Sequence, residues 1–306
     1  MSLLSLVLGR RGASGFGYAS TAEEVTEGLD LRGKTVLITG VNSGLGEESA
    51  RVLAKRGARI VGAARDIAKA TAAVKNLGAD AVPVACELSE PSSVRAAVES
   101  LKKQGLTFDV LLCNAGIMAL PKREILHGQE LQFLTNHLGH FILVTGLLEQ
   151  LGARGRVVIL SSAAHQAAPP GGIQFDDLTL EKNYRPWSAY GQSKLANLLF
   201  ARALSKRFAG TERTANAVHP GVIATNLGRH MGLLAKFGPP IANAIALKTV
   251  GEGAATQCYV ATNPKAAQVS GEYFADCNIA KSSAYGRDDA LAERLWSRTE
   301  DILRSI

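Results

Sequence analysis

The stretch Lys34-Thr-Val-Leu-Ile-Thr-Gly-Val-Asn-Ser-Gly-Leu-Gly46 decides the fold. A short apolar run is followed by a glycine-rich turn and then by an Ala- and Glu-bearing segment that predicts a helix. Gly40 would let the chain leave the strand tightly, Gly44 would let backbone N–H groups approach a pyrophosphate, and Gly46 would let the helix pack closely on the sheet. The stretch predicts a nucleotide-binding unit, the alternative being a turn that needs glycine for steric reasons alone.

Apolar runs of strand length alternate with segments of helical period along the rest of the chain. After the first strand, we expect strands at residues 59–63, 81–85, 108–113, 156–160 and 214–218, with a last one at 271–275. Nearly continuous apolar strands separated by helices are typical of a parallel sheet that is covered on both faces. The sequence therefore predicts a doubly wound α/β fold of the Rossmann type, with ligands at the carboxyl ends of the strands.

Composition excludes several classes of function. Of the 306 residues, 46% are hydrophobic and 20% charged, which is ordinary for a globular protein. The net charge of +7 comes from Lys and Arg scattered along the whole chain, so we expect a solvated basic surface and no nucleic-acid partner. Four cysteines without paired spacing predict neither a zinc site nor disulfides, and they favour a reducing compartment, cytoplasmic or organellar.

Residues 1–30 are predicted to form an N-terminal arm to which we assign no catalytic residue. Ser20-Thr-Ala-Glu-Glu24 predicts a short helix capped by Ser20 or Thr21. Its first apolar run is short and precedes the positive charges, which fits a secretory signal poorly. No run approaches the roughly twenty apolar residues of a membrane-spanning helix. Residues 31–306 are expected to form one domain, and docking of the arm to a partner or a membrane is an alternative role.

The residues after the second strand indicate which nucleotide binds. Ala63-Ala64-Arg65-Asp66 stands where an NAD enzyme carries an acidic residue for the ribose 2′-hydroxyl. A guanidinium at Arg65 would pair with a 2′-phosphate, whereas a carboxylate would repel it. The sequence therefore predicts NADP(H). The alternative is an exposed arginine at the start of a helix, with Asp66 as its neighbour.

Tyr190-Gly-Gln-Ser-Lys194 opens a helical segment and places a phenol and an ammonium one turn apart on one face. The ordinary pKa of tyrosine is about 10, and a neighbouring ammonium would lower it by favouring the phenolate. Such a pair suits general acid–base catalysis, although a lone Tyr-x-x-x-Lys is more often structural. Ser162, at the end of the strand 156–160, would hydrogen-bond a carbonyl oxygen that gains charge.

Two rival kinds of site are excluded. The histidines, including His137 and His140, lack metal-ligand spacing with any carboxylate, so no metal site is expected. Ser162 with His165 would suggest a hydrolase, but no Gly-x-Ser-x-Gly elbow is present.

Taken together, these motifs resemble those of the short-chain dehydrogenases/reductases over about residues 31–280. The resemblance rests on Thr39-Gly-x-x-x-Gly-x-Gly46, Asn114-Ala-Gly116, Asn136, Ser162, Tyr190-x-x-x-Lys194 and His219-Pro-Gly221. It implies a Rossmann fold and hydride transfer between nicotinamide and a carbonyl carbon. In the family, the tyrosine exchanges the proton, the lysine holds the ribose, the serine positions the oxygen and the asparagine holds a relay water; the matching residues are Tyr190, Lys194, Ser162 and Asn136.

The resemblance also implies the cofactor-binding positions. Glu87 replaces the usual Asp near the adenine, which puts that contact in doubt. Besides Tyr190 and Lys194, the implied positions are Gly40, Asn42, Ser43, Gly44, Leu45, Gly46, Arg65, Glu87, Leu88, Asn114, Ala115, Gly116, Pro220, Gly221 and Thr225.

Within the family, Thr135-Asn-His-Leu-Gly-His-Phe141 resembles the branch with retinol dehydrogenases, the WW-domain oxidoreductase and the plant chloroplast-envelope dehydrogenase Tic32. Gly12-Ala-Ser-Gly-Phe16 and Val269-Ser-Gly-Glu-Tyr-Phe274 are most similar to the Tic32 kind. An apolar lid at about residues 226–250 implies a hydrophobic alcohol, aldehyde or ketone as substrate, the alternatives being a helix pair over the sheet or a peripheral membrane contact. The rival function is an NADPH-sensing regulator at a membrane such as the chloroplast envelope, and a homodimer is a further expectation.

Overall fold

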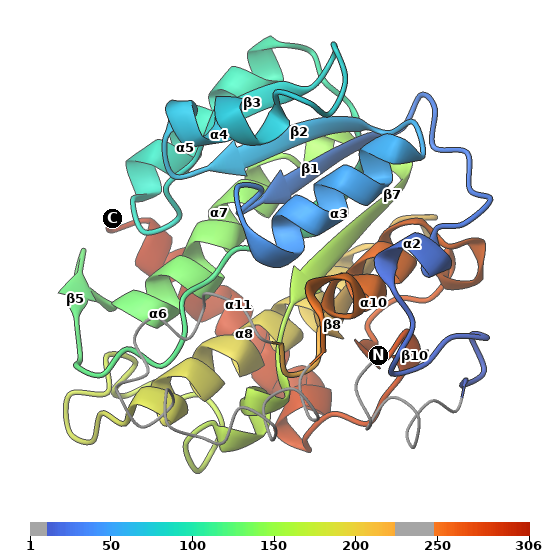
Figure 1. Cartoon of the computed structure of the whole chain (residues 1–306). Coiled ribbons are helices and arrows are strands. Elements are labelled where there is room, and N and C mark those ends of the chain that lie inside the picture. The colour runs from blue at the N-terminus through green and yellow to red at the C-terminus, as the bar shows by residue number, and fades with distance from the viewer. Residues whose placement is uncertain (1–10, 224–247) are drawn as a thin grey trace, which may run out of the picture.

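The computed structural model describes residues 11–223 and 248–306, and an eight-stranded sheet forms its centre (Figure 1). Its strands are β1 (Thr35–Thr39), β2 (Arg59–Ala64), β3 (Val82–Ala85), β4 (Phe108–Cys113), β7 (Leu151–Leu160), β8 (Thr214–His219), β9 (Tyr273–Ala275) and β10 (Asn278–Ile279). They lie in the order β10-β9-β8-β7-β4-β1-β2-β3, all parallel except β10, which is antiparallel to β9. The predicted doubly wound sheet is confirmed.

Helices cover both faces of this sheet. They are α2 (Ala22–Val25), α3 (Gly44–Lys55), α4 (Ile67–Val74), α5 (Pro91–Lys103), α6 (Leu131–Phe133), α7 (Gly139–Gly146), α8 (Pro186–Arg207), α10 (Val250–Thr262) and α11 (Asp289–Leu303). A π-helical turn, η1 (Leu134–Leu138), joins α6 to α7. The 3₁₀ turns are η2 (Leu148–Gln150), η3 (Ala163–Ala167), η6 (Pro264–Ala266) and η7 (Tyr285–Arg287).

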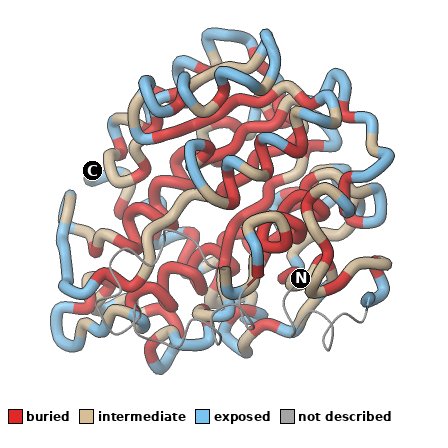
Figure 2. Tube along the Cα trace, in the orientation of Figure 1, coloured by how far each residue is buried: buried red, intermediate tan, exposed pale blue. Residues whose placement is uncertain are grey.

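Alternate residues of the central strands enter different cores, as a parallel sheet covered on both sides requires. In β1, Val36 and Ile38 pack with α2, α3 and α10, whereas Leu37 packs with α5, α7, α8 and α11. Figure 2 shows β1, β2, β4 and β8 and most of α8 buried, with the outer helix faces and loops more exposed. The carboxyl ends of β1, β4, β7 and β8 therefore meet at one edge that both cores hold rigid.

The structure departs from the expected strands at the start of β7, at a small hairpin and at the edge strand β10, which was not expected. β7 begins at Leu151, five residues before the predicted 156–160, and its pairing to β4 shifts between Phe108 and Val110. The early part carries Gly152 and Arg154 and is partly exposed, so apolar periodicity does not reveal it. A small hairpin, β5 (Ile125–Leu126) with β6 (Gln129–Glu130), was also not expected.

The N-terminal arm ends in the short helix that the sequence predicts. Thr21 is its cap: the hydroxyl accepts from Glu24 N at 3.2 Å, and the Glu24 carboxylate accepts from Thr21 N at 2.8 Å. This capping box satisfies two backbone donors that the helix leaves unpaired. Of the two proposed caps, Thr21 is therefore the correct one.

All four cysteines are free and buried. Burial raises the pKa of Cys86, Cys258 and Cys277 to about 12 and also raises that of Cys113. Over residues 11–223 and 248–306, no helix has the length and apolar character to cross a membrane. The same ranges hold no cluster of three or more His, Cys, Asp or Glu suited to a metal ion.

Candidate active site

The glycine-rich turn leaves β1 as the sequence predicts. Gly40 and Gly44 have φ values of +68° and +59°, a region that L side chains avoid, and α3 begins at Gly44. A Cβ added to Gly46 would lie 2.2 Å from Gly40 O and 2.6 Å from Asn114 Nδ2. Position 46 therefore lies too close to Gly40, and to Asn114 at the end of β4, for any residue other than glycine.

Thr39 and Asn114 join the ends of β1 and β4. The Thr39 hydroxyl accepts from Asn114 N at 2.9 Å and from Ala115 N at 3.0 Å, and Asn114 Nδ2 donates to Thr39 O at 2.9 Å. Gln257 Nε2, from α10, donates to Asn114 Oδ1 at 3.2 Å. Thr39 and Gln257 support the nucleotide turn, yet sequence reasoning assigned neither of them to the site.

Asn136 lies in the π-helical turn η1 and is fully buried. Its Nδ2 donates to Ile117 O and to Ser193 Oγ, both at 2.9 Å, and its Oδ1 accepts from Ile117 N at 2.8 Å. Its backbone carbonyl lies 2.9 Å from His140 Nδ1. Asn136 therefore lies in a π-turn, a feature frequent at functional sites, and this turn directs its side chain toward Ser193 of α8.

Tyr190, Lys194 and Ser162 meet at the carboxyl edge of the sheet, as expected. The Ser162 side chain lies near enough to the Tyr190 phenol to lower its pKa. Lys194 Nζ lies 5.6 Å from the centroid of the Tyr190 ring and donates to Leu160 O at 3.0 Å. The three groups come from the end of β7 and from the second and third turns of α8.

The expected lowering of the phenol pKa is wrong for this arrangement. Burial raises the pKa of Tyr190 to about 12, and the Ser162 side chain offsets only part of that rise. Burial likewise lowers the pKa of Lys194 to about 8, because the ammonium is also removed from water. The buried phenol is therefore protonated near neutral pH and is suited to donate a proton.

Arg65 follows the last residue of β2 directly and is exposed. Its neighbour Asp66 caps α4, accepting from Lys69 N at 2.8 Å and Lys69 Nζ at 2.6 Å. The carboxylate beside Arg65 is thus paired with Lys69.

Glu87 and Leu88, which are expected near the adenine, follow β3 and are held by a local turn. Glu87 Oε1 accepts from the backbone N and the hydroxyl of Ser89, at 3.2 and 2.9 Å. Leu88 is buried, and its carbonyl packs on Gly139, where a Cβ would come within 2.3 Å. The Glu87 carboxylate is thus part of a local turn.

Pro220 and Gly221 follow β8, with Gly221 at φ +90°. Thr225 and most of the expected lid at 226–250 lie outside the described residues. His165 Nδ1 lies 2.6 Å from Ser162 O, and its Nε2 accepts from Ser283 N at 3.0 Å. Both ring nitrogens are therefore engaged away from the Ser162 hydroxyl, which argues against a hydrolase.

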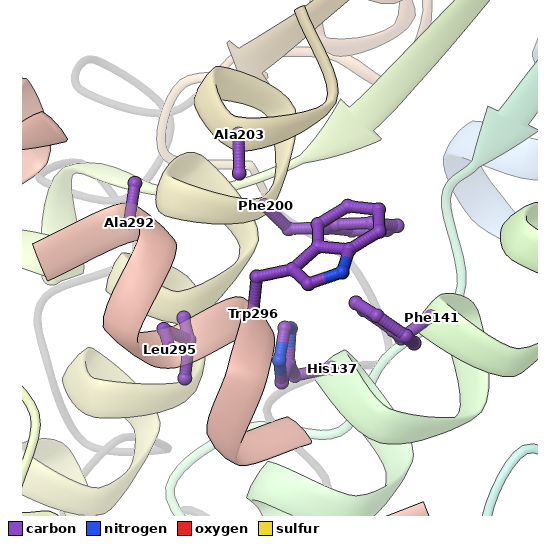
Figure 3. A pocket seen from close by; sticks show the side chains of 7 residues that line it. All are labelled: His137, Phe141, Phe200, Ala203, Ala292, Leu295 and Trp296. Carbon is purple, nitrogen blue, oxygen red and sulfur yellow. The ribbon is translucent and has the colours of Figure 1, made fainter. Parts of the chain in front are cut away.

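An aromatic cluster packs between α7, α8 and α11 (Figure 3), and the space it encloses does not admit a water molecule. The indole of Trp296 lies 4.7 Å from the Phe141 ring and 5.7 Å from the Phe200 ring, between centroids. Burial lowers the pKa of His137 to about 3, so its imidazole is neutral. These groups form core that fixes α7, α8 and α11, and they do not form a second ligand site.

A glycine-lined turn at the end of the first strand, together with a serine, a buried tyrosine and a buried lysine at the carboxyl edge of the sheet, defines an oxidoreductase of the Rossmann type. The short chain dehydrogenase family model matches residues 34–175. Over its whole length the chain is 40% identical to the whole of the Brassica napus protein "Short-chain dehydrogenase TIC 32 A, chloroplastic". The chain belongs to the short-chain dehydrogenases/reductases, which use a nicotinamide cofactor.

Two further similarities agree with this membership. Human retinol dehydrogenase 12 is 41% identical over 286 residues, which cover 90% of this chain and 88% of that protein. The crystal structure of an uncharacterised protein from Mycobacterium paratuberculosis superposes with a TM-score of 0.75 at 34% identity, covering 92% of this chain and 97% of that one. The resemblance to the retinol dehydrogenase and Tic32 branch is confirmed.

Proposed function

We propose that this protein is an NADP(H)-dependent oxidoreductase that transfers hydride between nicotinamide and a hydrophobic alcohol, aldehyde or ketone. The single observation that carries the proposal is the buried pair of Tyr190 and Lys194, whose ammonium lies 5.6 Å from the centroid of the phenol ring and directly beside Gly116. When bound, the cofactor supplies or accepts the hydride. The residues fit such a group, because a Cβ on Gly116 would fill the cradle within 2.9 Å of Asn136 Oδ1 and 3.4 Å of Lys194 Nζ.

The residues of this chain handle the proton and the orientation. A carbonyl oxygen held between the hydroxyls of Ser162 and Tyr190 would accept two hydrogen bonds, which strengthen as the oxygen gains charge. Tyr190, with its pKa raised to about 12, keeps its proton until that charge develops and then donates it. Lys194 lies beside the phenol ring and favours the resulting phenolate. Oxidation of an alcohol uses the same groups in reverse.

The preference for NADP(H) rests on Arg65. The Asp66 carboxylate is engaged by Lys69, and the exposed guanidinium of Arg65 would pair with a 2′-phosphate. The affinities of NADPH and NADH are measured for the wild type and for Arg65→Ala. The wild type is expected to prefer NADPH, and the variant should lose that preference, with Arg95→Ala, on α5, as a control. Equal affinities in the wild type would refute the NADP(H) assignment.

Activity is tested with purified protein, NADPH and a panel of aldehydes and ketones that includes a retinoid. NADPH oxidation is expected to be faster with large apolar carbonyls than with small polar ones. Tyr190→Phe should bind NADPH normally and lose turnover by on the order of a thousandfold, since general acid catalysis contributes about 10² to 10⁴. Full activity of that variant would refute the assignment of Tyr190.

A second function is an NADP(H)-sensing regulator at a membrane, which the match over the full chain to the chloroplastic plant relative favours. The same panel of aldehydes and ketones distinguishes the enzyme from the regulator. Tight NADPH binding with no turnover of any carbonyl would support the regulator, whereas turnover that depends on Tyr190 supports the enzyme. The intact set of Asn136, Ser162, Tyr190 and Lys194 favours the enzyme, because nucleotide sensing alone does not require a proton donor.

A further inference from the structure

Lys248 is a buried cation that the proposed reaction does not use. Its side chain is 1% exposed, and its Nζ lies 2.5 Å from Asp276 Oδ1. The same ammonium lies 4.6 Å from the centroid of the Tyr18 ring. A lysine removed from water is costly unless such partners surround it, so this position requires a particular environment.

Lys248 contacts the turn that follows β8. Its backbone N donates to Val222 O at 2.9 Å, and it forms a parallel bridge with Ile223. Its alkyl chain lies against Gly221, where a Cβ would come within 2.7 Å of Lys248 Cδ. Main chain and side chain of Lys248 thus both support the Pro220–Gly221 turn, which the family resemblance assigns to the cofactor.

Asp276 is held by Asn278, which also bonds to the N-terminal arm. It starts the two-residue connection from β9 to β10, with φ +50°. Asn278 Nδ2 donates to Asp276 O at 2.7 Å and to Phe16 O at 3.0 Å, and Asn278 Oδ1 accepts from Ser14 N at 3.0 Å.

The arm is also anchored on its other side. The Phe16 ring lies 5.8 Å from the Tyr259 ring, between centroids, and Lys265 Nζ donates to Ser14 O at 3.0 Å. The arm is thus fixed on both α10 and the β9–β10 connection. This places Tyr18 over the ion pair of Lys248 and Asp276, a position where the face of an aromatic ring attracts a cation.

We propose that Lys248 is a positioning residue for the cofactor-binding turn 220–223. The N-terminal arm then contributes to the active site, because Tyr18 acts on that turn through Lys248. This inference rests on the proposed cofactor site, and on the pairing of β8 with β7, which puts the turn after β8 next to Ser162 on the side where the nicotinamide would lie. It predicts that the arm affects binding of the nicotinamide half and leaves binding of the adenine half unchanged, since the glycine-rich turn and Arg65 lie at β1 and β2.

The test measures the dissociation constants of NADPH and of 2′-phospho-ADP-ribose, which lacks the nicotinamide ring. Lys248→Met keeps the alkyl stem and removes the charge. It should weaken NADPH binding on the order of tenfold, because a small displacement of a positioning group is costly, and leave 2′-phospho-ADP-ribose binding unchanged. Lys34→Met, which breaks an exposed ion pair with Asp109, is the matched control and should change neither constant.

Tyr18→Leu tests the arm. It should weaken NADPH binding alone, and the double variant with Lys248→Met should be no worse than Lys248→Met, because both act through one group. Additive effects would overturn the role given to the arm. Equal weakening of both ligands, or of neither, in Lys248→Met would overturn the positioning role. A wild type that binds neither ligand would instead refute the proposed cofactor site.

Discussion

The imidazole Nε2 of His140 lies 2.9 Å from the hydroxyl oxygen of Thr39, 101 residues away in the chain. Its Nδ1 lies 2.9 Å from the carbonyl oxygen of Asn136. One neutral tautomer satisfies both contacts: Nδ1–H donates to Asn136, and Nε2 accepts from Thr39, which in turn accepts from Asn114 N. The nucleotide turn and the π-turn of Asn136 are therefore joined by a single buried side chain.

Removal of this link should destabilise the protein. His140→Leu leaves the Thr39 hydroxyl and the Asn136 carbonyl without this partner, and we expect the free energy of unfolding to fall by about 1–3 kcal/mol. Urea unfolding at pH 7 measures this free energy for the wild type and the variant. His127→Asn is the control: His127 is exposed with φ +50°, a conformation that Asn tolerates. Equal stability of the two variants would contradict the role of the link.

Stability should fall as the pH drops below neutrality. Burial lowers the pKa of His137 to about 3 and of His140 to about 4, from 6.5. Because the unfolded chain binds more protons between these values, the stabilisation is complete above about pH 6.5 and declines as the pH falls toward 4, by about 1.4 kcal/mol per pH unit for each histidine. Urea unfolding at pH 7, 6 and 5 measures the slope. His137→Phe should reduce it, whereas His127→Asn should not; identical slopes in all three proteins would contradict the assignment.

Gly46 should be irreplaceable, unlike another helical glycine. In Gly46→Ala the new Cβ would meet Gly40 O at 2.2 Å, a backbone atom that cannot move without shifting β1. We expect nucleotide binding to be lost and stability to decrease. In Gly251→Ala, within α10, the nearest atom would be 3.7 Å away, so stability should rise by about 0.4–1 kcal/mol. Thermal unfolding and NADPH titration measure both effects, and normal NADPH binding by Gly46→Ala would contradict the close approach.

Trp296 should carry much of the docking of α11. Its indole lies in the aromatic cluster of Figure 3, and the Arg207 guanidinium lies 3.6 Å from its ring centroid. Trp296→Ala should cost about 3–5 kcal/mol in urea unfolding. Trp187→Ala provides the comparison, because that ring is 48% exposed and its loss should cost within about 0.5 kcal/mol. A cost below that of Trp187→Ala would show that α11 is held by other contacts.

Features encoded by local chemistry were predictable from the sequence. Gly40 and Gly46 stand where steric contact excludes side chains, and Thr21 and Glu24 form a capping box within four residues. The alternation of apolar runs predicts the parallel sheet because each strand contributes residues to two cores. The order of the motifs also predicted that Ser162 and Tyr190 lie close together, because both are at the carboxyl edge of that sheet.

What the sequence did not reveal depends on contacts between distant segments. The π-turn at Asn136 leaves no periodicity signal, and its partners are Ile117 and Ser193, well separated along the chain. The pKa of Tyr190 is set by burial, which a Tyr-x-x-x-Lys spacing cannot express. The contact of Lys248 with Tyr18 likewise joins two segments that no motif relates.

The burial of all four thiols makes this chain a convenient background for chemical labelling. A protonated sulfhydryl inside the core reacts slowly with maleimides and iodoacetamides, because the thiolate is the nucleophile. A single cysteine engineered on the surface would then be the one fast-reacting position in the native protein. Spectroscopic probes could be attached there without first removing Cys86, Cys113, Cys258 or Cys277.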